Sequence, residues 1–78
     1  MTLKVRFVVC LDNEGFSASL ERFKIYRVLP DEQAAKHGLL RVIDESGEDY
    51  LYPADRFAPI EPPEAVERAL EETFATTP

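Results

Sequence analysis

One stretch, GLLRVIDESGEDYLYPADRFAPI, runs from Gly38 to Ile60 and constrains the fold more than any other part of the chain. Apolar residues dominate 39–43, and Tyr50-Leu51-Tyr52 carries the aromatic side chains that a half-buried strand favours. Between them lies Asp44-Glu45-Ser46-Gly47. Asp suits the first position of a type I turn, and Gly suits a position with positive φ. The stretch therefore predicts a β-hairpin.

Gly47 also predicts the register of this hairpin. A one-residue bulge at Gly47 places Val42 opposite Tyr50 and Leu40 opposite Tyr52. The tyrosines then share a face, either as a wall of the core or as an exposed aromatic groove. The few large residues in a chain of 78 favour the core.

The segment after the hairpin predicts a corner and a closing strand. Pro53-Ala54-Asp55-Arg56-Phe57 suits a single 3₁₀ turn that carries Phe57 into the core. Ala58-Pro59-Ile60 then forms a short last strand. Because Pro59 has no backbone N–H, this strand should lie at a sheet edge or pair on one side only.

Two further strands and a short helix are predicted before the hairpin. Apolar residues alternate from Leu3 to Leu11, and Phe23 to Leu29 is rich in β-branched and aromatic residues. Turn-forming residues between them favour an irregular loop over 12–22. A short helical turn is expected near 31–37, because Asp31 can cap its start and a glycine closes it.

A last helix is predicted near 62–75, after a proline-rich start that suits a helix N-terminus. Val66, Leu70 and Phe74 fall on one side at helical spacing. A helix of this length is marginal alone in water, so the stripe is expected to pack on the sheet, with the Val8 and Cys10 side of the first strand as a candidate surface. The predicted organisation is one domain, with a β-barrel over 1–61 and a C-terminal helix over 62–78 packed on it.

The order of these elements resembles SH3 domains. The specific similarity is the run Tyr50-Leu51-Tyr52-Pro53-Ala54-Asp55-Arg56-Phe57, which matches the aromatic–Pro–polar–aromatic corner before the closing strand of an SH3 domain. The resemblance covers Leu3 to Ile60 and implies an all-β, five-stranded SH3-like barrel. The chain has no Trp and no ALYDY-type run, so the resemblance does not extend to the recognition of proline-rich peptides.

The chain also resembles a group of short bacterial proteins that carry a Lys-Ile-Tyr … Asp-Glu-Ser-Gly-Glu-Asp-Tyr-Leu-Tyr-Pro … Phe pattern. Here the pattern occupies Lys24 to Tyr26, Asp44 to Pro53, and Phe57. This similarity implies no activity.

Charge and hydropathy restrict the partners. The formal net charge is −6, which disfavours nonspecific binding to nucleic acid or anionic lipid and permits a basic partner protein. No apolar run approaches the ~20 residues that span a bilayer. A single Cys makes no internal disulfide, and no signal peptide pattern is visible, so we expect a cytoplasmic protein.

Catalytic and metal-binding patterns are not found in the sequence. Cys10 lies in a predicted strand and is interpreted as a small buried hydrophobe, and His37 as a solvated side chain near a helix end. No Cys/His cluster has zinc-ligand spacing, and no triad or phosphate loop is present. We therefore expect no enzyme activity, no cofactor and no metal.

Tyrosines and turn carboxylates are the candidate partner-binding residues. They are Tyr26, Tyr50, Tyr52, Asp44, Glu45, Glu48 and Asp49. Four carboxylates within six residues could hold a hard cation, but turn chemistry and solubility account for them more simply. The expected function is a noncatalytic protein-interaction or regulatory module with an acidic surface.

The alternative function is a nucleic-acid-associated small β-barrel. It requires a contiguous, unpaired basic stripe on the outside of the sheet. The candidate residues are Lys4, Arg6, Arg22, Lys24, Arg27 and Arg41.

Overall fold

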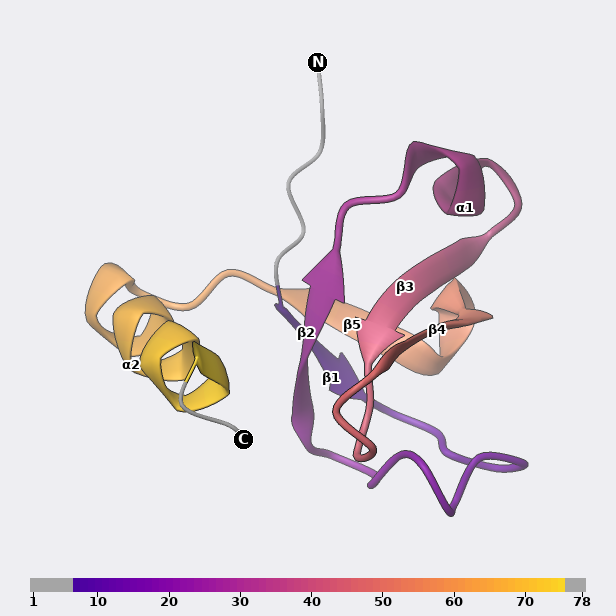
Figure 1. Cartoon of the computed structure of the whole chain (residues 1–78), viewed down its shortest axis with the longest axis horizontal. Helices are drawn as coiled ribbons and strands as arrows, with labels where there is room; N and C mark the ends of the chain where they lie inside the picture. The colour runs from indigo at the N-terminus through magenta and orange to yellow at the C-terminus, as the bar shows by residue number, and fades with distance from the viewer. Residues whose placement is uncertain (1–6, 76–78) are drawn as a thin grey trace.

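The protein folds around one five-stranded antiparallel sheet in the order β4-β3-β2-β1-β5 (Figure 1). A computed structural model describes residues 7–75, with side chains over 7–73. The strands are β1 Phe7–Cys10, β2 Ile25–Leu29, β3 Leu39–Ile43, β4 Asp49–Pro53 and β5 Phe57–Ile60, and the helices are α1 Glu32–Lys36, the 3₁₀ turn η1 Ala54–Arg56 and α2 Glu64–Ala75. The mainly-β prediction is confirmed. β4 and β5 are the two edges, so the described sheet is not closed.

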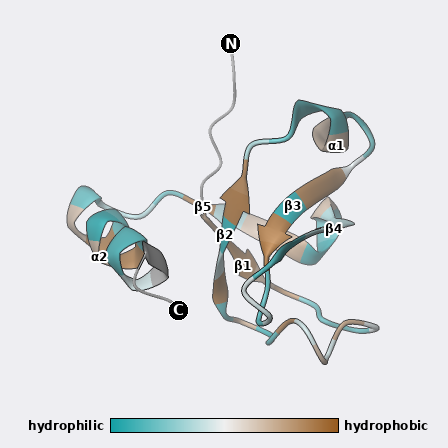
Figure 2. Ribbon diagram, in the orientation of Figure 1, coloured by the Kyte–Doolittle hydropathy of each residue, from teal (hydrophilic) through white to brown (hydrophobic). Residues whose placement is uncertain are grey.

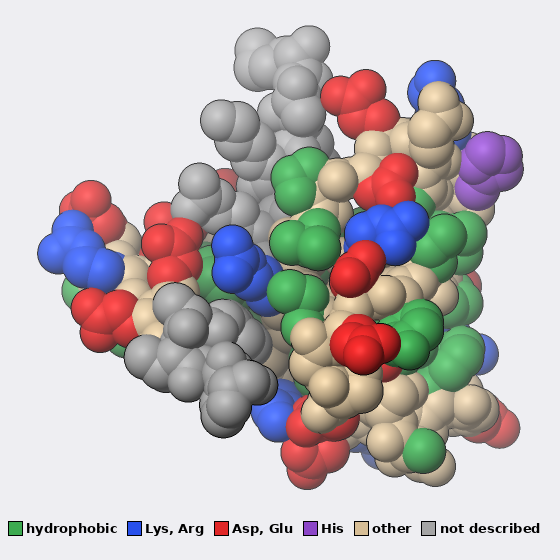
Figure 3. All heavy atoms as spheres, in the orientation of Figure 1, with side chains coloured by type: hydrophobic (Ala, Val, Ile, Leu, Met, Phe, Trp, Pro, Cys, Tyr) green, Lys and Arg blue, Asp and Glu red, His purple; other side chains and the backbone are tan. Residues whose placement is uncertain are grey.

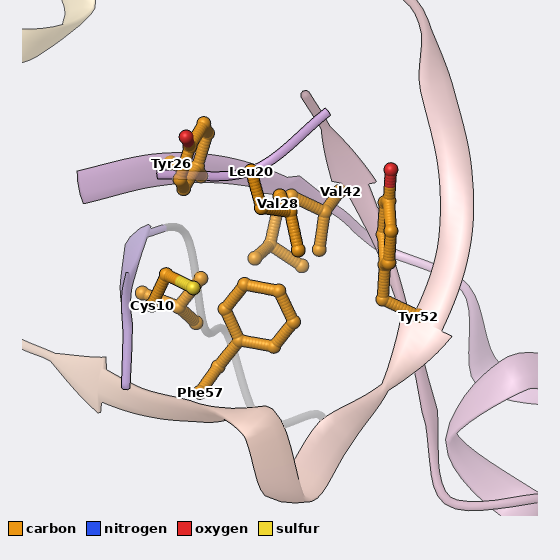
Figure 4. Close-up of a cluster of buried hydrophobic side chains, with 8 residues drawn as sticks. Cys10, Leu20, Tyr26, Val28, Val42, Tyr52 and Phe57 are labelled. Carbon is orange, nitrogen blue, oxygen red and sulfur yellow. The ribbon is translucent and has the colours of Figure 1, made fainter. Parts of the chain in front are cut away.

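The largest cluster of buried side chains lies on one face of the sheet. Register pairs Val8 with Tyr26 and Val28 with Val42, so alternate residues of neighbouring strands point to the same side. Figure 4 shows these side chains converging with others from the strands and the first loop. The cluster comprises Val8, Cys10, Leu20, Tyr26, Val28, Val42, Tyr52 and Phe57. Figure 2 shows the central strands as the most hydrophobic part of the ribbon.

The predicted hairpin register is confirmed. Val42 pairs with Tyr50, and Leu40 pairs with Tyr52. Gly47 has φ +84, which is the conformation that the bulge requires. Phe57 is buried directly after η1, as the corner predicts.

The short helix α1 and its cap also form as predicted. The Asp31 side chain accepts a hydrogen bond from the Ala34 backbone N–H at 2.9 Å, which satisfies one free donor of the first turn. Gly38 follows with φ +71, and Lys36 lies in the last turn. His37 is exposed, and its ring nitrogen lies 2.9 Å from the Gln33 carbonyl oxygen.

Both early strands are shorter than the sequence predicts. β1 ends at Cys10, so Leu11 lies outside the strand and is 42% exposed, while residues 3–6 lie outside the described residues. β2 begins at Ile25 because Phe23 has φ +68, which is incompatible with an extended strand. The loop over 12–22 is irregular, but Leu20 within it is only 1% exposed and completes the core.

Helix α2 stands at the end of the chain, joined to β5 by a short extended segment (Figure 1). Val66 is 46% exposed and Leu70 is half-buried, while the Phe74 side chain lies outside the described side chains. Packing of the whole stripe on the sheet stays a prediction. Among the described side chains, the buried cluster around Val8 and Cys10 includes Leu20 and no residue of α2.

Candidate functional site: the β3–β4 hairpin and its free edge

The hairpin turn is held by both backbone and side-chain hydrogen bonds. The Gly47 N–H donates to the Asp44 carbonyl at 2.9 Å, and the Asp44 N–H donates to the Glu48 carbonyl at 3.1 Å. The first bond closes the four-residue turn, and the second closes the bulge that follows it. The Ser46 N–H also donates to the Asp44 carboxylate at 2.9 Å, as expected for Asp at a turn start. These bonds fix the tip from which β4 begins.

Asp44 is not a solvent-facing carboxylate, and this corrects the expectation that it contacts a partner. Its residue is only 7% exposed. Tyr52 donates its hydroxyl hydrogen to Asp44 Oδ2 at 2.6 Å, and the Ser46 hydroxyl lies 2.5 Å from Oδ1. Burial raises the pKa of Asp44, but the hydrogen bonds from Ser46 and Tyr52 together outweigh burial and hold the pKa below its usual value. Asp44 is therefore a structural carboxylate that anchors the turn to the core.

Glu45 is bound to two side chains of β2 and the segment before it. The Tyr26 hydroxyl donates to Glu45, and the Lys24 ammonium lies 2.8 Å from the same carboxylate. The hydrogen bond from Lys24 is the largest cause that lowers the pKa of Glu45, and the hydrogen bond from Tyr26 is the second. Burial is the largest cause that raises the pKa of Tyr26, and the hydrogen bond to Glu45 is the second. Glu45 thus connects the turn to β2 while its side chain stays 32% exposed.

Asp49 and Arg41 form a second ionic group on the opposite face of the hairpin. Arg41 on β3 donates to Asp49 at 2.9 Å and to Asp31, the cap of α1, at 2.9 Å. The Arg41 side chain is 33% exposed, and that of Asp49 is 44% exposed, so solvent screens this group. The group connects β3 to β4 and to the cap of α1.

The three tyrosines differ in exposure, although each donates to a turn carboxylate. Tyr26 and Tyr52 are buried at 2% and 5% exposure, so the core alternative is correct for both. Tyr50 is 50% exposed, and its hydroxyl donates to Glu48 at 3.1 Å. Of the three, only Tyr50 presents its ring to solvent.

The outer side of β4 is a free edge, because β4 pairs only with β3 among the described strands. In an antiparallel ladder, residues alternate between facing the partner strand and facing away. The Asp44 N–H donates to the Glu48 carbonyl, so the backbone of Glu48 faces β3. Every second residue after Glu48 faces the same way, which places the backbones of Tyr50 and Tyr52 towards β3. The backbone N–H and C=O groups of Asp49 and Leu51 therefore face away from the sheet.

We call Glu48, Asp49, Tyr50 and Leu51 the β4 edge. All four residues are exposed, and Leu51 is 43% exposed on the face opposite to Tyr50. Figure 3 shows hydrophobic and acidic side chains next to one another over the β3–β4 hairpin. The β4 edge thus combines open backbone groups, two large exposed side chains and two carboxylates.

The other sheet edge, β5, differs in its backbone. The Leu11 N–H donates to the Arg56 carbonyl at 2.8 Å, so the backbone of Arg56 faces β1. Because residues alternate along the strand, the backbones of Phe57 and Pro59 face away from β1. Pro59 has no N–H, and the Phe57 N–H already donates to the Ala54 carbonyl. The prediction that Pro59 lies on an edge strand is confirmed, and this edge offers no free donor at either position.

A second exposed apolar group was missed by the sequence interpretation. Phe23 is 66% exposed, and the Arg22 guanidinium lies 4.6 Å from its ring centroid. The Phe23 N–H donates to the Cys10 carbonyl at 2.6 Å, next to the exposed Leu11. Alternation in FKIYRVL favours a strand over this position, and nothing in the local sequence marks its left-handed backbone.

Chemical groups suited to catalysis are not brought together among the described residues. Cys10 is fully buried, and burial raises the pKa of its thiol. His37 is exposed at the end of α1, so these two residues do not form a nucleophile–base pair. No group of three or more His, Cys, Asp or Glu in this part of the chain is placed to hold a metal ion.

Two of the candidate basic residues pair with carboxylates. Lys24 pairs with Glu45, and Arg41 pairs with Asp31 and Asp49. Lys4 and Arg6 lie outside the described residues.

Comparison of the chain with protein families, with curated proteins and with solved structures finds no match. In the part of the chain that the structure describes, no helix is both long and apolar enough to cross a membrane.

Proposed function

We propose that the chain is a small noncatalytic protein-interaction module of SH3-like topology, which binds a basic segment of another protein at the β4 edge. Two features support the SH3-like part of the proposal. The strand order is β4-β3-β2-β1-β5, with the chain's last strand beside its first. A 3₁₀ turn, η1, connects β4 to β5 at the Tyr-Pro corner.

The observation that carries the proposed function is the composition of the β4 edge. Tyr50 and Leu51 are 50% and 43% exposed on a strand with one free side, which is costly unless the surface is used. Glu48 and Asp49 precede them and give the same surface a negative charge. Carboxylates of this kind accelerate association with a basic partner, and the apolar side chains determine how long it stays bound.

Local charge favours a basic protein segment over nucleic acid. Around the hairpin, the four turn carboxylates and Asp31 outnumber Lys24 and Arg41, which are both paired. Nucleic acid needs unpaired cations along a continuous path. The net charge of −6 acts in the same direction.

The proposed function is tested by comparing the proteins captured from the source cells by three versions of the chain. A Tyr50→Ser, Leu51→Ser variant removes the apolar part of the β4 edge. Val66→Ser is the matched control, because Val66 is equally exposed but lies on α2. Capture is carried out from lysates with and without nuclease treatment, and captured proteins are identified by mass spectrometry.

We expect a set of proteins that the wild-type chain and Val66→Ser both capture and that the double variant loses. Circular dichroism checks that the double variant keeps its fold. Equal capture by all three versions contradicts binding at the β4 edge. Capture that disappears on nuclease treatment shows a nucleic-acid-associated protein instead.

A further inference from the structure

The backbone of β4 offers a more specific mode of binding than its side chains alone. Asp49 and Leu51 each direct an N–H and a C=O away from the sheet. Such a row is a template for another extended segment, whose own backbone completes the ladder. We infer that the β4 edge binds an extended, basic segment of a partner protein as an added sixth strand. This inference rests on the proposed function and specifies its binding mode.

Only one of the two sheet edges is suited to strand addition. At β5, Pro59 removes an outward donor and the Phe57 N–H is already bonded within the η1 corner. At β4, proline occurs only at the last position, Pro53, and both preceding outward residues keep their N–H groups. The added strand is therefore placed beside β4.

The charge of the hairpin favours a basic segment over a second copy of the same chain. Each copy carries a net charge of −6, and pairing two β4 edges brings two sets of turn carboxylates close together. Glu48 binds the Tyr50 hydroxyl and has no cation beside it among the described ion pairs. A lysine or arginine opposite Glu48 supplies that cation.

The sequence of β4 also indicates the pattern of the added strand. Directly opposed residues of neighbouring strands share a face, so Glu48 and Asp49 select two consecutive cations. Tyr50 and Leu51 select two consecutive apolar residues, one on each face. The pattern Lys-Lys-Val-Val-Lys-Lys offers this match in either strand direction.

The test uses a blocked synthetic peptide, Lys-Lys-Val-Val-Lys-Lys, and the whole chain labelled with ¹⁵N. We expect peptide titration to shift the backbone amides of Asp49 and Leu51 and to slow their hydrogen exchange. Glu-Glu-Val-Val-Glu-Glu is the charge control and should bind at least tenfold more weakly. Two further peptides carry N-methyl groups at alternating positions, which removes backbone donors and keeps every side chain. One of these two should also bind at least tenfold more weakly.

Strand addition is overturned if both N-methylated peptides bind as tightly as the unmethylated peptide. The proposed function survives that result if the capture of partner proteins still depends on Tyr50 and Leu51. In the absence of peptide, the amide signals of Asp49 and Leu51 are compared at several protein concentrations. If they shift with protein concentration, β4 pairs with a second copy of the chain, and the basic segment is overturned as its occupant. Loss of both the peptide response and the capture difference overturns the inference together with the proposed function.

Two substitutions at Leu51 give an independent measurement. Leu51→Pro removes the outward N–H on an edge where proline is tolerated, and Leu51→Ala keeps the N–H while shortening the side chain. We expect peptide binding to be lost in Leu51→Pro and reduced but present in Leu51→Ala. Retained binding in a folded Leu51→Pro variant contradicts the inference, and the N-methylated peptides decide the question if that variant does not fold.

Discussion

At the scale of single residues, adjacent carboxylates of one turn have different roles. Asp44 is buried against Tyr52 and Ser46, whereas Glu48 is exposed at the start of the β4 edge. Sequence alone treats these residues alike, because their type and their turn position are similar. Their difference arises from the direction of each side chain relative to the core, which is set by strand register. The structure therefore places Asp44 against the core and leaves Glu48 exposed to solvent.

Gly47 is predicted to be the residue of the turn that is most sensitive to a single methyl group. Its φ of +84 is a conformation that residues with a Cβ rarely adopt, although no atom lies within 4 Å of the position where a Cβ would sit. Gly47→Ala should therefore lower the free energy of unfolding by about 1 kcal/mol through backbone strain alone. The measurement is urea denaturation, and Gly47→Asn is the control because Asn tolerates this region better. An unchanged midpoint for Gly47→Ala contradicts the bulged turn.

Phe23 offers the converse case, a bulky residue with φ +68 that is 66% exposed. A left-handed conformation costs an ordinary residue about 1–2 kcal/mol relative to the right-handed one. We expect Phe23→Gly to be more stable than Phe23→Ala by about 1 kcal/mol, since both lose the ring and only alanine keeps the strain. Thermal denaturation of the two variants measures this difference. Greater stability of the alanine variant would show that Phe23 has an ordinary backbone conformation.

At the scale of elements, local sequence patterns predict the hairpin, η1 and the α1 cap well. Each of these depends on residues close together in the chain, such as Asp31 and Ala34, or Asp44 and Gly47. The burial of Leu20 could not be read in the same way, because its partners come from distant strands. The β4 edge is intermediate. The sequence indicates Glu48, Asp49 and Tyr50 as candidates but not Leu51, and the free side of β4 depends on the order of all five strands.

Pro59 is predicted to protect the β5 edge from pairing with other chains. It faces away from β1, so a residue with an N–H at this position adds a donor to the open side of the strand. We expect Pro59→Val to increase self-association at high protein concentration while leaving the fold intact. Light scattering over a concentration series measures this effect, and Ala58→Val is a matched control because Ala58 faces β1. Equal behaviour of both variants and the wild type contradicts a protective role of Pro59.

At the scale of the whole molecule, two electrostatic effects on stability have opposite signs. The net charge of −6 at pH 7 produces general repulsion, which decreases as the pH falls towards the pI of about 4.6. Specific bonds to Asp44 and Glu45 favour their ionised forms and are lost when these groups are protonated. The specific bonds should dominate, because they are partly buried and short, whereas the remaining charges are spread over a solvated surface and screened.

The resulting prediction is a loss of stability in acid. The pKa values of Asp44 and Glu45 are lowered in the folded protein from ordinary values of 3.8 and 4.5. Between the folded and unfolded pKa values the unfolded chain binds more protons, so the stabilisation is complete above about pH 4.5 and decreases as the pH falls through the lower, folded values. We expect the urea midpoint to be steady from pH 7 to 5.5 and to fall steeply below pH 4.5.

Asp44→Asn tests the origin of this acid sensitivity. It should cost about 1–2 kcal/mol at neutral pH, because an amide is a weaker acceptor for the Tyr52 hydroxyl than a carboxylate. The same variant should lose less stability than the wild type between pH 5 and pH 3, since one of the responsible groups no longer titrates. Glu14→Gln is the matched control, because Glu14 is exposed on the first loop and should leave both the midpoint and its pH dependence unchanged. If Asp44→Asn loses as much stability in acid as the wild type does, the sensitivity comes from other carboxylates and the buried Tyr52–Asp44 bond is not its source.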